Sequence, residues 1–313
     1  MAPTVYAIEL HEQFRGITTR HGVLMRGDAG WGEFSPFEDY TDRESVPWLA
    51  SAVEAATLGW PAPVRDRIPI NVTVPVVPPE RAEQIVAASG CRTAKVKVAD
   101  PRMDLAADCE RVAAVRDGLG PGGAIRVDAN AAWDVDTAVT AIRMLERAAG
   151  SLEYVEQPCR SLEELAAVRR RVEVPIAADE SIRRAADPMR VALAGAADIA
   201  VLKVAPLGGV GPALEVAQAC GLPCVVSSAV ETSIGLAAGI ALAAALPELD
   251  YACGLGTLSL LRNDVCEQPL AEVDGWLPVA ARAPEPDLLA SRRADDATSA
   301  RWLDRLARVR ALS

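Results

Sequence analysis

Histidine is almost absent from this chain of 313 residues, in which His11 and His21 are the only two. Both lie near the N-terminus, so the rest of the chain has no histidine to act as a general base. Any proton abstraction there needs another side chain, and lysine can do it where its neighbours keep the amine neutral.

Other absences exclude whole classes of protein. The net charge is -11 and Lys/Arg residues form no basic stripe, which argues against nucleic-acid binding. The longest apolar segment, residues 234–246, is interrupted by glycines and too short to span a bilayer. The stretch MAPTVYAIELHEQF lacks the features of a signal peptide, and the seven cysteines include no CxxC pair. We therefore expect a cytoplasmic protein with reduced thiols and no membrane partner.

From about residue 68, short apolar runs alternate with longer amphipathic ones. They recur about every 25–30 residues, the length of one strand–helix unit. Because the short runs are apolar on both faces, they fit a parallel sheet buried between a core and helices. Eight such runs, as a closed parallel barrel needs, lie at residues 68–74, 94–98, 125–128, 152–156, 176–178, 199–202, 224–227 and 251–255.

Local signals mark the ends of the intervening helices. Asp100 before Pro101 predicts an N-cap with proline at the first helical position. Ser161 and Glu164 have the spacing of a capping box, and Gly150 is placed to end the preceding helix.

The two ends of the chain differ from this pattern. The first 65 or so residues contain alternating stretches and glycine turns, which predict a small antiparallel sheet followed by a helix at 45–58. The tail is rich in Pro and Arg, and we expect it to return to this sheet with a last helix at 300–312. The predicted fold is α/β, a modified (β/α)8 TIM-type barrel (67–279) with an α+β capping domain built from residues 1–66 and the tail 280–313.

Three acids stand where successive apolar runs end: Asp128, Glu156 and Asp179. The carboxyl ends of barrel strands meet at one rim, and adjacent strands lie roughly 5 Å apart. A single acid at a strand end is more often a helix cap, but three unpaired carboxylates so close would repel one another strongly. Oxygen ligands favour Mg²⁺ or Mn²⁺ over Zn²⁺, so the set predicts a divalent-cation site.

Lysines occupy similar places on neighbouring runs. Lys95 and Lys97 are two residues apart, so on a strand both point to the same face. We expect Lys97, nearer the strand end, to be the acid/base group, and Lys95 to be its cationic neighbour, which lowers the pKa of Lys97. Lys203 ends the sixth run, across the barrel mouth. Simple salt bridges between these lysines and the acids are the alternative reading.

The motifs KVK, RVDANAAW, VEQP, ADES and LKVAPLGG occur in this order. Together they resemble the enolase superfamily, in which a lysine or histidine base works with Mg²⁺. Within its muconate-lactonizing-enzyme-like subgroup, the chain is most similar to the o-succinylbenzoate synthase family of menaquinone biosynthesis. The similarity extends over nearly the whole chain, including the stretch FRG…GWGEFSPF near the N-terminus.

The resemblance implies a role for each matching residue. It makes Asp128, Glu156 and Asp179 ligands of Mg²⁺ (with Mn²⁺ as a possible substitute), Lys97 the acid/base catalyst and Lys203 the lysine on the opposite face of the substrate. Supporting roles fall on residues beside these: Asn130 and Glu180 would hold the ligands in place, and Ser227, Ser228, Arg126 and Gly254 would contact the substrate.

The implied reaction is the dehydration of 2-succinyl-6-hydroxy-2,4-cyclohexadiene-1-carboxylate to o-succinylbenzoate, through lysine proton abstraction and a metal-stabilised enediolate. The partner would be this small anionic carboxylate, and the sequence is compatible with a monomer. The lack of a late histidine separates the chain from mandelate-racemase-like members, and ACGLGTLSLLRNDV lacks the Asp-x-Asp pair of dipeptide epimerases. N-acylamino acid racemisation and cycloisomerisation use the same two lysines and remain alternatives, as does a non-catalytic barrel.

Overall fold

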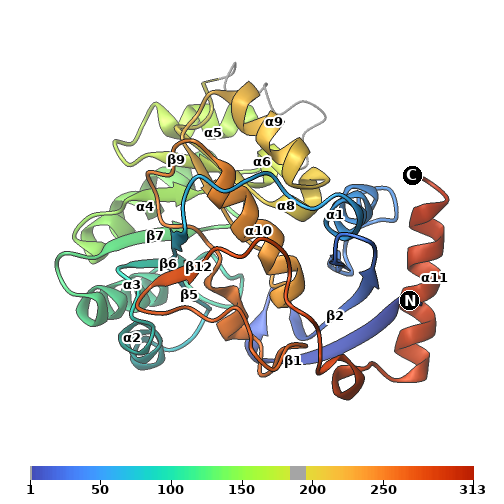
Figure 1. Cartoon of the computed structure of the whole chain (residues 1–313). Coiled ribbons are helices and arrows are strands. Elements are labelled where there is room, and N and C mark those ends of the chain that lie inside the picture. Colours follow the sequence, from blue (N-terminus) through green and yellow to red (C-terminus); the bar gives the residue numbers. More distant parts are fainter. Residues whose placement is uncertain (1, 184–194) are drawn as a thin grey trace.

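A computed structural model describes residues 2–183 and 195–313 of the chain. Its centre is a curled sheet of seven parallel strands in the order β11-β10-β9-β8-β7-β6-β5 (Figure 1). The strands are β5 (Val72–Val74), β6 (Thr93–Lys97), β7 (Ala124–Asp128), β8 (Tyr154–Glu156), β9 (Ile176–Ala178), β10 (Ile199–Leu202) and β11 (Cys224–Val226). Their carboxyl ends share one rim, as expected for strands that run in one direction.

Cys253 and Gly254 close this sheet into a barrel. They form single parallel bridges to Ile70 and Ser227, respectively, in place of the predicted strand at 251–255, which is therefore wrong in extent. Backbone hydrogen bonds run from Asn71 N to Cys253 O (2.9 Å) and from Gly254 N to Val226 O (2.8 Å). A Cβ at Gly254 would lie 2.6 Å from the Ser227 Oγ, so the backbones can approach this closely only at a glycine.

The predicted first strand, 68–74, is divided in the structure. Its first part, β4 (Arg67–Pro69), pairs antiparallel with β12 (Trp276–Pro278), and only β5 joins the barrel sheet. The division falls where the hydrogen-bond partner changes: Ile70 N donates to Gly275 O, whereas Asn71 N donates to Cys253 O. The apolar pattern continues through this point, so it does not mark the change of partner.

Helices cover the outside of the barrel: α2 (Pro79–Ala88), α3 (Leu105–Leu119), α4 (Val135–Ala149), α5 (Leu162–Arg169), α6 (Glu180–Arg183), α8 (Val204–Leu207), α9 (Val210–Cys220) and α10 (Ser233–Ala245). The capping box of Ser161 and Glu164 is confirmed at the start of α5. The N-cap predicted at Asp100 is wrong. Asp104 caps α3 by accepting from Ala107 N, while Asp100 accepts from the backbone and guanidinium of Arg102.

The capping domain contains an antiparallel sheet of β1 (Thr4–Phe14), β2 (Ile17–Arg26) and β3 (Trp31–Phe34), with helix α1 (Val46–Thr57) against it. After the short helices η1 (Gly256–Leu260) and η2 (Leu289–Arg292), the tail ends in α11 (Asp296–Arg310). Figure 1 shows α11 at the edge of the molecule, on the side where both termini lie.

A shared apolar cluster joins α11 to the N-terminal sheet and to α1. Trp302 of α11 packs edge-on against Phe34, with ring centroids 6.3 Å apart, and the same cluster includes Trp48 of α1. The predicted fold class, a modified barrel with a cap made from both ends of the chain, is confirmed. In the described ranges, no helix is long and apolar enough to cross a membrane, and the seven cysteines are free.

Buried polar groups also hold the cap on the barrel. The Glu33 carboxylate accepts hydrogen bonds from Thr232 N (3.1 Å) and Gly235 N (3.0 Å) at the start of α10, and from the Tyr6 hydroxyl (2.7 Å). Arg20 donates to Val230 O (2.9 Å) in the loop before that helix. Two residues of the cap thus bind the backbone that follows β11.

Glu231 lies inside this junction and makes the stability of the fold depend on pH. Burial and the Glu33 carboxylate raise the pKa of Glu231 to about 6, although the Arg20 guanidinium lowers it. Because the folded chain holds this proton more tightly than the unfolded chain, the stabilisation is complete below about pH 4.5 and is lost as pH rises through 6. Relative to the Glu231→Gln variant, the wild type should lose about 2 kcal/mol of unfolding free energy between pH 4 and pH 7.

Urea unfolding of both proteins across this range measures the difference. A difference that stays constant with pH would show that Glu231 does not titrate in this window.

Candidate active site

Lys97, Asp128 and Glu156 form one row across the rim of the barrel. Lys97 pairs with Asp128 in the β6–β7 ladder, and Asp128 pairs with Glu156 in the β7–β8 ladder. Residues paired in this way point to the same face of a sheet, so the row follows from the register alone. Glu156 pairs in turn with Ala177, and Asp179 follows two residues later, on the same face of β9.

The acids and lysines of this row are in direct contact. Lys97 Nζ lies 2.5 Å from Asp128 Oδ2, and Lys95 Nζ lies 3.1 Å from Glu156 Oε2 and 3.7 Å from Asp128 Oδ2. Asp128 and Glu156 are almost completely buried, and Lys95 is nearly so. One continuous chain of alternating charges therefore spans three strands.

Lys203 completes the arrangement from the other side. It follows β10, and its Nζ lies 2.5 Å from Asp179 Oδ2. In the sheet order, β7, β8 and β9 lie between β6, which carries Lys97, and β10. The structure thus brings together the three predicted acids and three predicted lysines, with the amines of Lys97 and Lys203 at the two ends of the acidic row.

Asn130 and Glu180 lie beside the row. Asn130 Oδ1 accepts from Lys97 Nζ (2.9 Å), and Asn130 N donates to Asp128 Oδ1 (3.0 Å). The other side of the Asn130 amide donates to Glu180 Oε1 (3.4 Å). With a φ of 46°, Asn130 adopts a left-handed conformation that asparagine tolerates better than most residues.

Gln157 also organises the site, although the sequence analysis assigned it no role. Its Oε1 accepts from Asp179 N (2.9 Å) and Ser181 N (3.1 Å), which fixes the turn that carries Asp179. The residue is completely buried, with a φ of 40°. Its position in the motif VEQP, directly after Glu156, was the available signal.

The charges of the row set its pKa values. Burial and the neighbouring Asp128 carboxylate raise the pKa of Glu156 to about 7, against the opposing effect of Lys95. Burial also acts to raise the pKa of Asp128, but the ammonium groups of Lys97 and Lys95 outweigh it and hold that pKa well below the usual range. Burial acts to lower the pKa of Lys95, and the carboxylates of Glu156 and Asp128 reverse that effect and raise it.

These donors fit a hard divalent cation. Asp128, Glu156 and Asp179 supply only oxygen atoms, and burial together with the neighbouring carboxylates raises the pKa of Glu156. Among the residues that the structure describes, no three acidic, His or Cys side chains already stand in a metal-binding arrangement. Asp128 contacts the Lys97 ammonium and Asp179 contacts that of Lys203 instead.

Ser227, Ser228 and Gly254 meet where β11 joins the closing segment of the barrel. Ser228 Oγ lies 3.0 Å from Gly254 O and 2.6 Å from Thr257 Oγ1. Both serines line a small cavity of about 20 Å³ between the barrel and α1 of the cap. The structure therefore groups three of the four predicted substrate contacts.

Arg126 is separate from this group. It precedes Asp128 by two residues and lies one layer deeper in the barrel, completely buried. Its guanidinium donates to Asn71 Oδ1 (3.2 Å) and Ala252 O (2.6 Å) and stacks on Tyr154 at 4.6 Å. These contacts fill the interior of the barrel, below the acidic row.

The cap contributes an aromatic ring to the site. Phe14, the last residue of β1, lies with its ring centroid 5.4 Å from Lys97 Nζ. An aromatic face stabilises a cation at this distance, so Phe14 covers the amine from the cap side. Phe14 begins the FRG stretch that the sequence analysis noted without assigning this residue a role.

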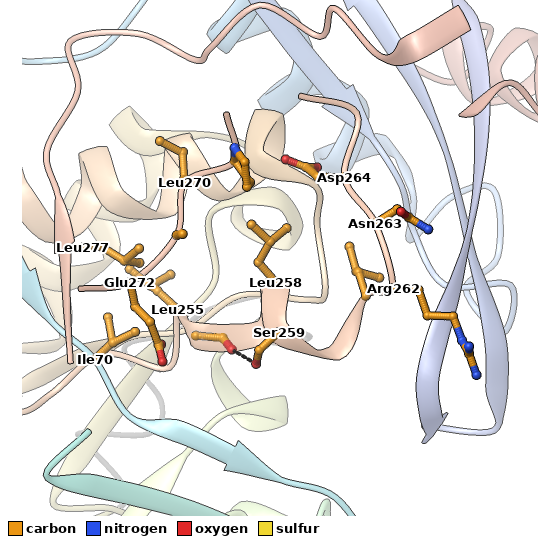
Figure 2. Close-up of a pocket in the computed structure, with 14 residues that line it drawn as sticks. Ile70, Leu255, Leu258, Ser259, Arg262, Asn263, Asp264, Leu270, Glu272 and Leu277 are labelled. Atoms are coloured by element: carbon orange, nitrogen blue, oxygen red, sulfur yellow. Dashed lines mark hydrogen bonds between the residues drawn. The ribbon is translucent and has the colours of Figure 1, made fainter. Parts of the chain in front are cut away.

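A larger cavity of about 300 Å³ lies elsewhere, between Ile70 and the part of the chain from Leu255 to Leu277 (Figure 2). Its walls are mainly apolar, including Leu258, Leu270 and Leu277, with Asp264 and Glu272 at its edges. None of the predicted site residues lines it. The size of this cavity therefore does not identify it as the active site.

The chain is similar to known proteins over nearly its whole length. Residues 79–284 match the family described as enolase C-terminal domain-like, and residues 5–56 match the one described as enolase N-terminal domain-like. The o-succinylbenzoate synthase of Thermobifida fusca is 62% identical over 311 residues, covering 99% of this chain and 96% of that protein. The o-succinylbenzoate synthase of Mycolicibacterium smegmatis is 53% identical over 309 residues, covering 98% and 95%.

A solved structure shows the same fold. The substrate-liganded complex of the L-Ala-D/L-Glu epimerase from Bacillus subtilis matches with a TM-score of 0.78 and 26% identity, over 89% of this chain and 95% of that one. The sequence relatives share far more identity and nearly the full length. This chain therefore belongs to the enolase superfamily and, within it, to the o-succinylbenzoate synthase family.

Proposed function

We propose that this chain is a Mg²⁺-dependent lyase of menaquinone biosynthesis that dehydrates 2-succinyl-6-hydroxy-2,4-cyclohexadiene-1-carboxylate to o-succinylbenzoate. The observation that carries the proposal is the contact of Lys97 with Asp128 and Asn130 at one end of a buried acidic row. It places an amine beside the carboxylates expected to hold the cation. Family membership supports the same reaction.

In this reaction, Lys97 moves both protons. Its neutral amine takes the hydrogen from the ring carbon that bears the carboxylate, and the electrons of that C–H bond are delocalised into the carboxylate. The C–O bond to the hydroxyl on the adjacent carbon then breaks as the ring becomes aromatic. The Lys97 ammonium protonates the departing hydroxyl, which leaves as water, so one group serves as base and then as acid.

Asp128, Glu156 and Asp179 would hold Mg²⁺, with Asn130 orienting Asp128. When bound, the cation supplies charge stabilisation to the carboxylate of the substrate, worth several kcal/mol. The protein contributes the oxygen donors, their burial and the exclusion of water from the row.

Lys203 has no proton to move in this scheme. Its ammonium would lie against the face of the ring and its delocalised charge, a cation–π contact. In an N-acylamino acid racemase, the same residue would be the second acid/base. The placement of Lys97 and Lys203 at opposite ends of the acidic row keeps this second activity as the alternative.

Replacing Lys97 with Ala should lower kcat about 10³-fold or more, because one residue supplies both the base and the acid. Absorbance of the aromatic product measures turnover, and circular dichroism checks the fold. Activity within tenfold of the wild type would remove Lys97 from the proposed role.

Replacing Lys203 with Ala separates the two candidate reactions. The variant should still exchange the α-hydrogen of the cyclohexadiene substrate with deuterium, since Lys97 takes that proton, while dehydration becomes slower. Mass spectrometry of recovered substrate follows the exchange, and N-succinylamino acids provide the racemase assay. The racemase would be favoured if the variant lost all exchange and the wild type turned over N-succinylamino acids faster than the cyclohexadiene substrate.

Replacing Glu156 with Gln should weaken Mg²⁺ binding by 10–100-fold or more, because it removes a central charged ligand. Mutating residues that only support metal ligands already lowers metal affinity by about 10–100-fold. Titration calorimetry with Mg²⁺ measures affinity, and EDTA should abolish wild-type turnover. The variant Glu164→Gln, at the capping box of α5, is the matched control and should bind Mg²⁺ normally. Equal affinity in wild type and Glu156→Gln would exclude Glu156 as a ligand.

A further inference from the structure

A glutamate of the capping domain binds the start of α9, one short helix after Lys203. Glu54 is half-buried on α1, and its carboxylate accepts hydrogen bonds from Val210 N (2.5 Å) and Gly211 N (2.9 Å). These are the first backbone groups of α9. The N-cap residue of α9, Gly209, offers no side chain for them, so the cap domain supplies the acceptor.

The glycine at this N-cap leaves room for Glu54. A Cβ on Gly209 would lie 2.4 Å from Glu54 Oε2, so the carboxylate would have to move away from the start of α9. Gly209 also has a φ of 136°, a conformation that residues with a side chain rarely adopt. The backbone of this turn is therefore shaped to receive the carboxylate.

Only one short helix separates this contact from Lys203. Lys203 is the N-cap residue of α8, and Leu207 N donates back to Lys203 O (3.3 Å). Gly209 N donates to Val204 O (3.1 Å), which ties the start of α9 to the residue next to Lys203. Backbone hydrogen bonds thus connect α8 and the start of α9 to Lys203 and Val204.

The helix α8 also packs against both domains. Val204 belongs to the apolar cluster of the barrel, whereas Ala205 belongs to that of the cap. The side chains of Ser51 and Ala55 on α1 line a small cavity together with these two residues. α8 therefore lies between the two domains, and the cap contacts it on the same side as Glu54.

We propose that Glu54 is a positioning residue for Lys203, through which the capping domain sets the distance of this amine from the substrate. The inference rests on the proposed role of Lys203 at the substrate face. Removing the carboxylate leaves Val210 N and Gly211 N without their acceptor, so the turn relaxes and Lys203 shifts from its place beside Asp179.

The kinetic test is a double-mutant cycle. Glu54→Ala should lower kcat about tenfold with little change in KM, since displacement of a positioned group by about 1 Å reduces rates by up to 10²-fold. In a Lys203→Ala background, the same change should alter kcat less than twofold, because the group it positions is gone. Equal losses in both backgrounds would overturn the proposal and leave Glu54 with a purely structural role.

Two further variants keep the test decisive. Glu54→Gln keeps one acceptor oxygen but turns an amide NH2 toward the second backbone N–H, so it should recover only part of the lost kcat, and it serves as the test if Glu54→Ala does not fold. Asp295→Ala removes the N-cap carboxylate of α11, which accepts from Thr298 N (2.7 Å) far from the barrel, and should leave kcat unchanged. A tenfold loss of kcat in Asp295→Ala would mean that weakening any helix N-cap lowers the rate, and this result would contradict the proposal.

A labelling experiment gives a result whether or not the proposed reaction is right. Acetic anhydride at a fixed pH, followed by peptide mass spectrometry, compares the modification rates of Lys203 and Lys97 in one sample. In Glu54→Ala, Lys203 should react severalfold faster, while Lys97 keeps its wild-type rate as the internal control. Unchanged labelling of Lys203 would reject the positioning role even if the cyclohexadiene substrate is turned over normally.

Discussion

Three carboxylates cannot lie buried at one rim of a barrel without positive charge between them, and this constraint explains the site. Burying a charged group is expensive unless it is paired. Lys97 and Lys95 therefore alternate with Asp128 and Glu156, and Lys203 neutralises Asp179. Burial and the neighbouring Asp128 carboxylate still raise the pKa of Glu156, although Lys95 opposes this effect, so the lysines do not fully offset the cost of burying the acids.

The sequence was sufficient to predict this row because each member is fixed by a local rule. A strand alternates its side chains with a period of two, and parallel strands end at one rim, so Lys97, Asp128 and Glu156 could be placed side by side without coordinates. The capping box at Ser161 was predictable for a similar reason, since donor and acceptor lie three residues apart. Asp100 had an equally good local signal, but the chain makes another turn before α3 begins, and Asp104 caps it.

The remaining features depend on partners that are distant in the sequence. Glu54 contacts a residue 156 positions away, and Glu33 one 199 positions away. Each looks like an ordinary surface glutamate in the sequence. The closing segment at Cys253 is similar: its pairing with Ile70 depends on how the whole barrel curls, not on its own apolar pattern. Arg126 was placed correctly on its strand. However, the alternation of side chains does not tell how deep a residue lies in the barrel, and in the structure Arg126 contacts partners below the rim.

The positions of Glu33 and Glu54 also bear on where an anionic substrate binds. In a barrel of alternating strands and helices, the helix N-termini lie at the same rim as the strand ends, and each attracts negative charge. At α9 and α10, the carboxylates of the capping domain already occupy these backbone donors. In the proposed reaction, the substrate carboxylate is therefore excluded from those two positions, which leaves the amines of the acidic row to bind it. The contacts of Glu33 and Glu54 also hold the capping domain on the barrel, so one set of interactions both joins the two domains and occupies these helix N-termini.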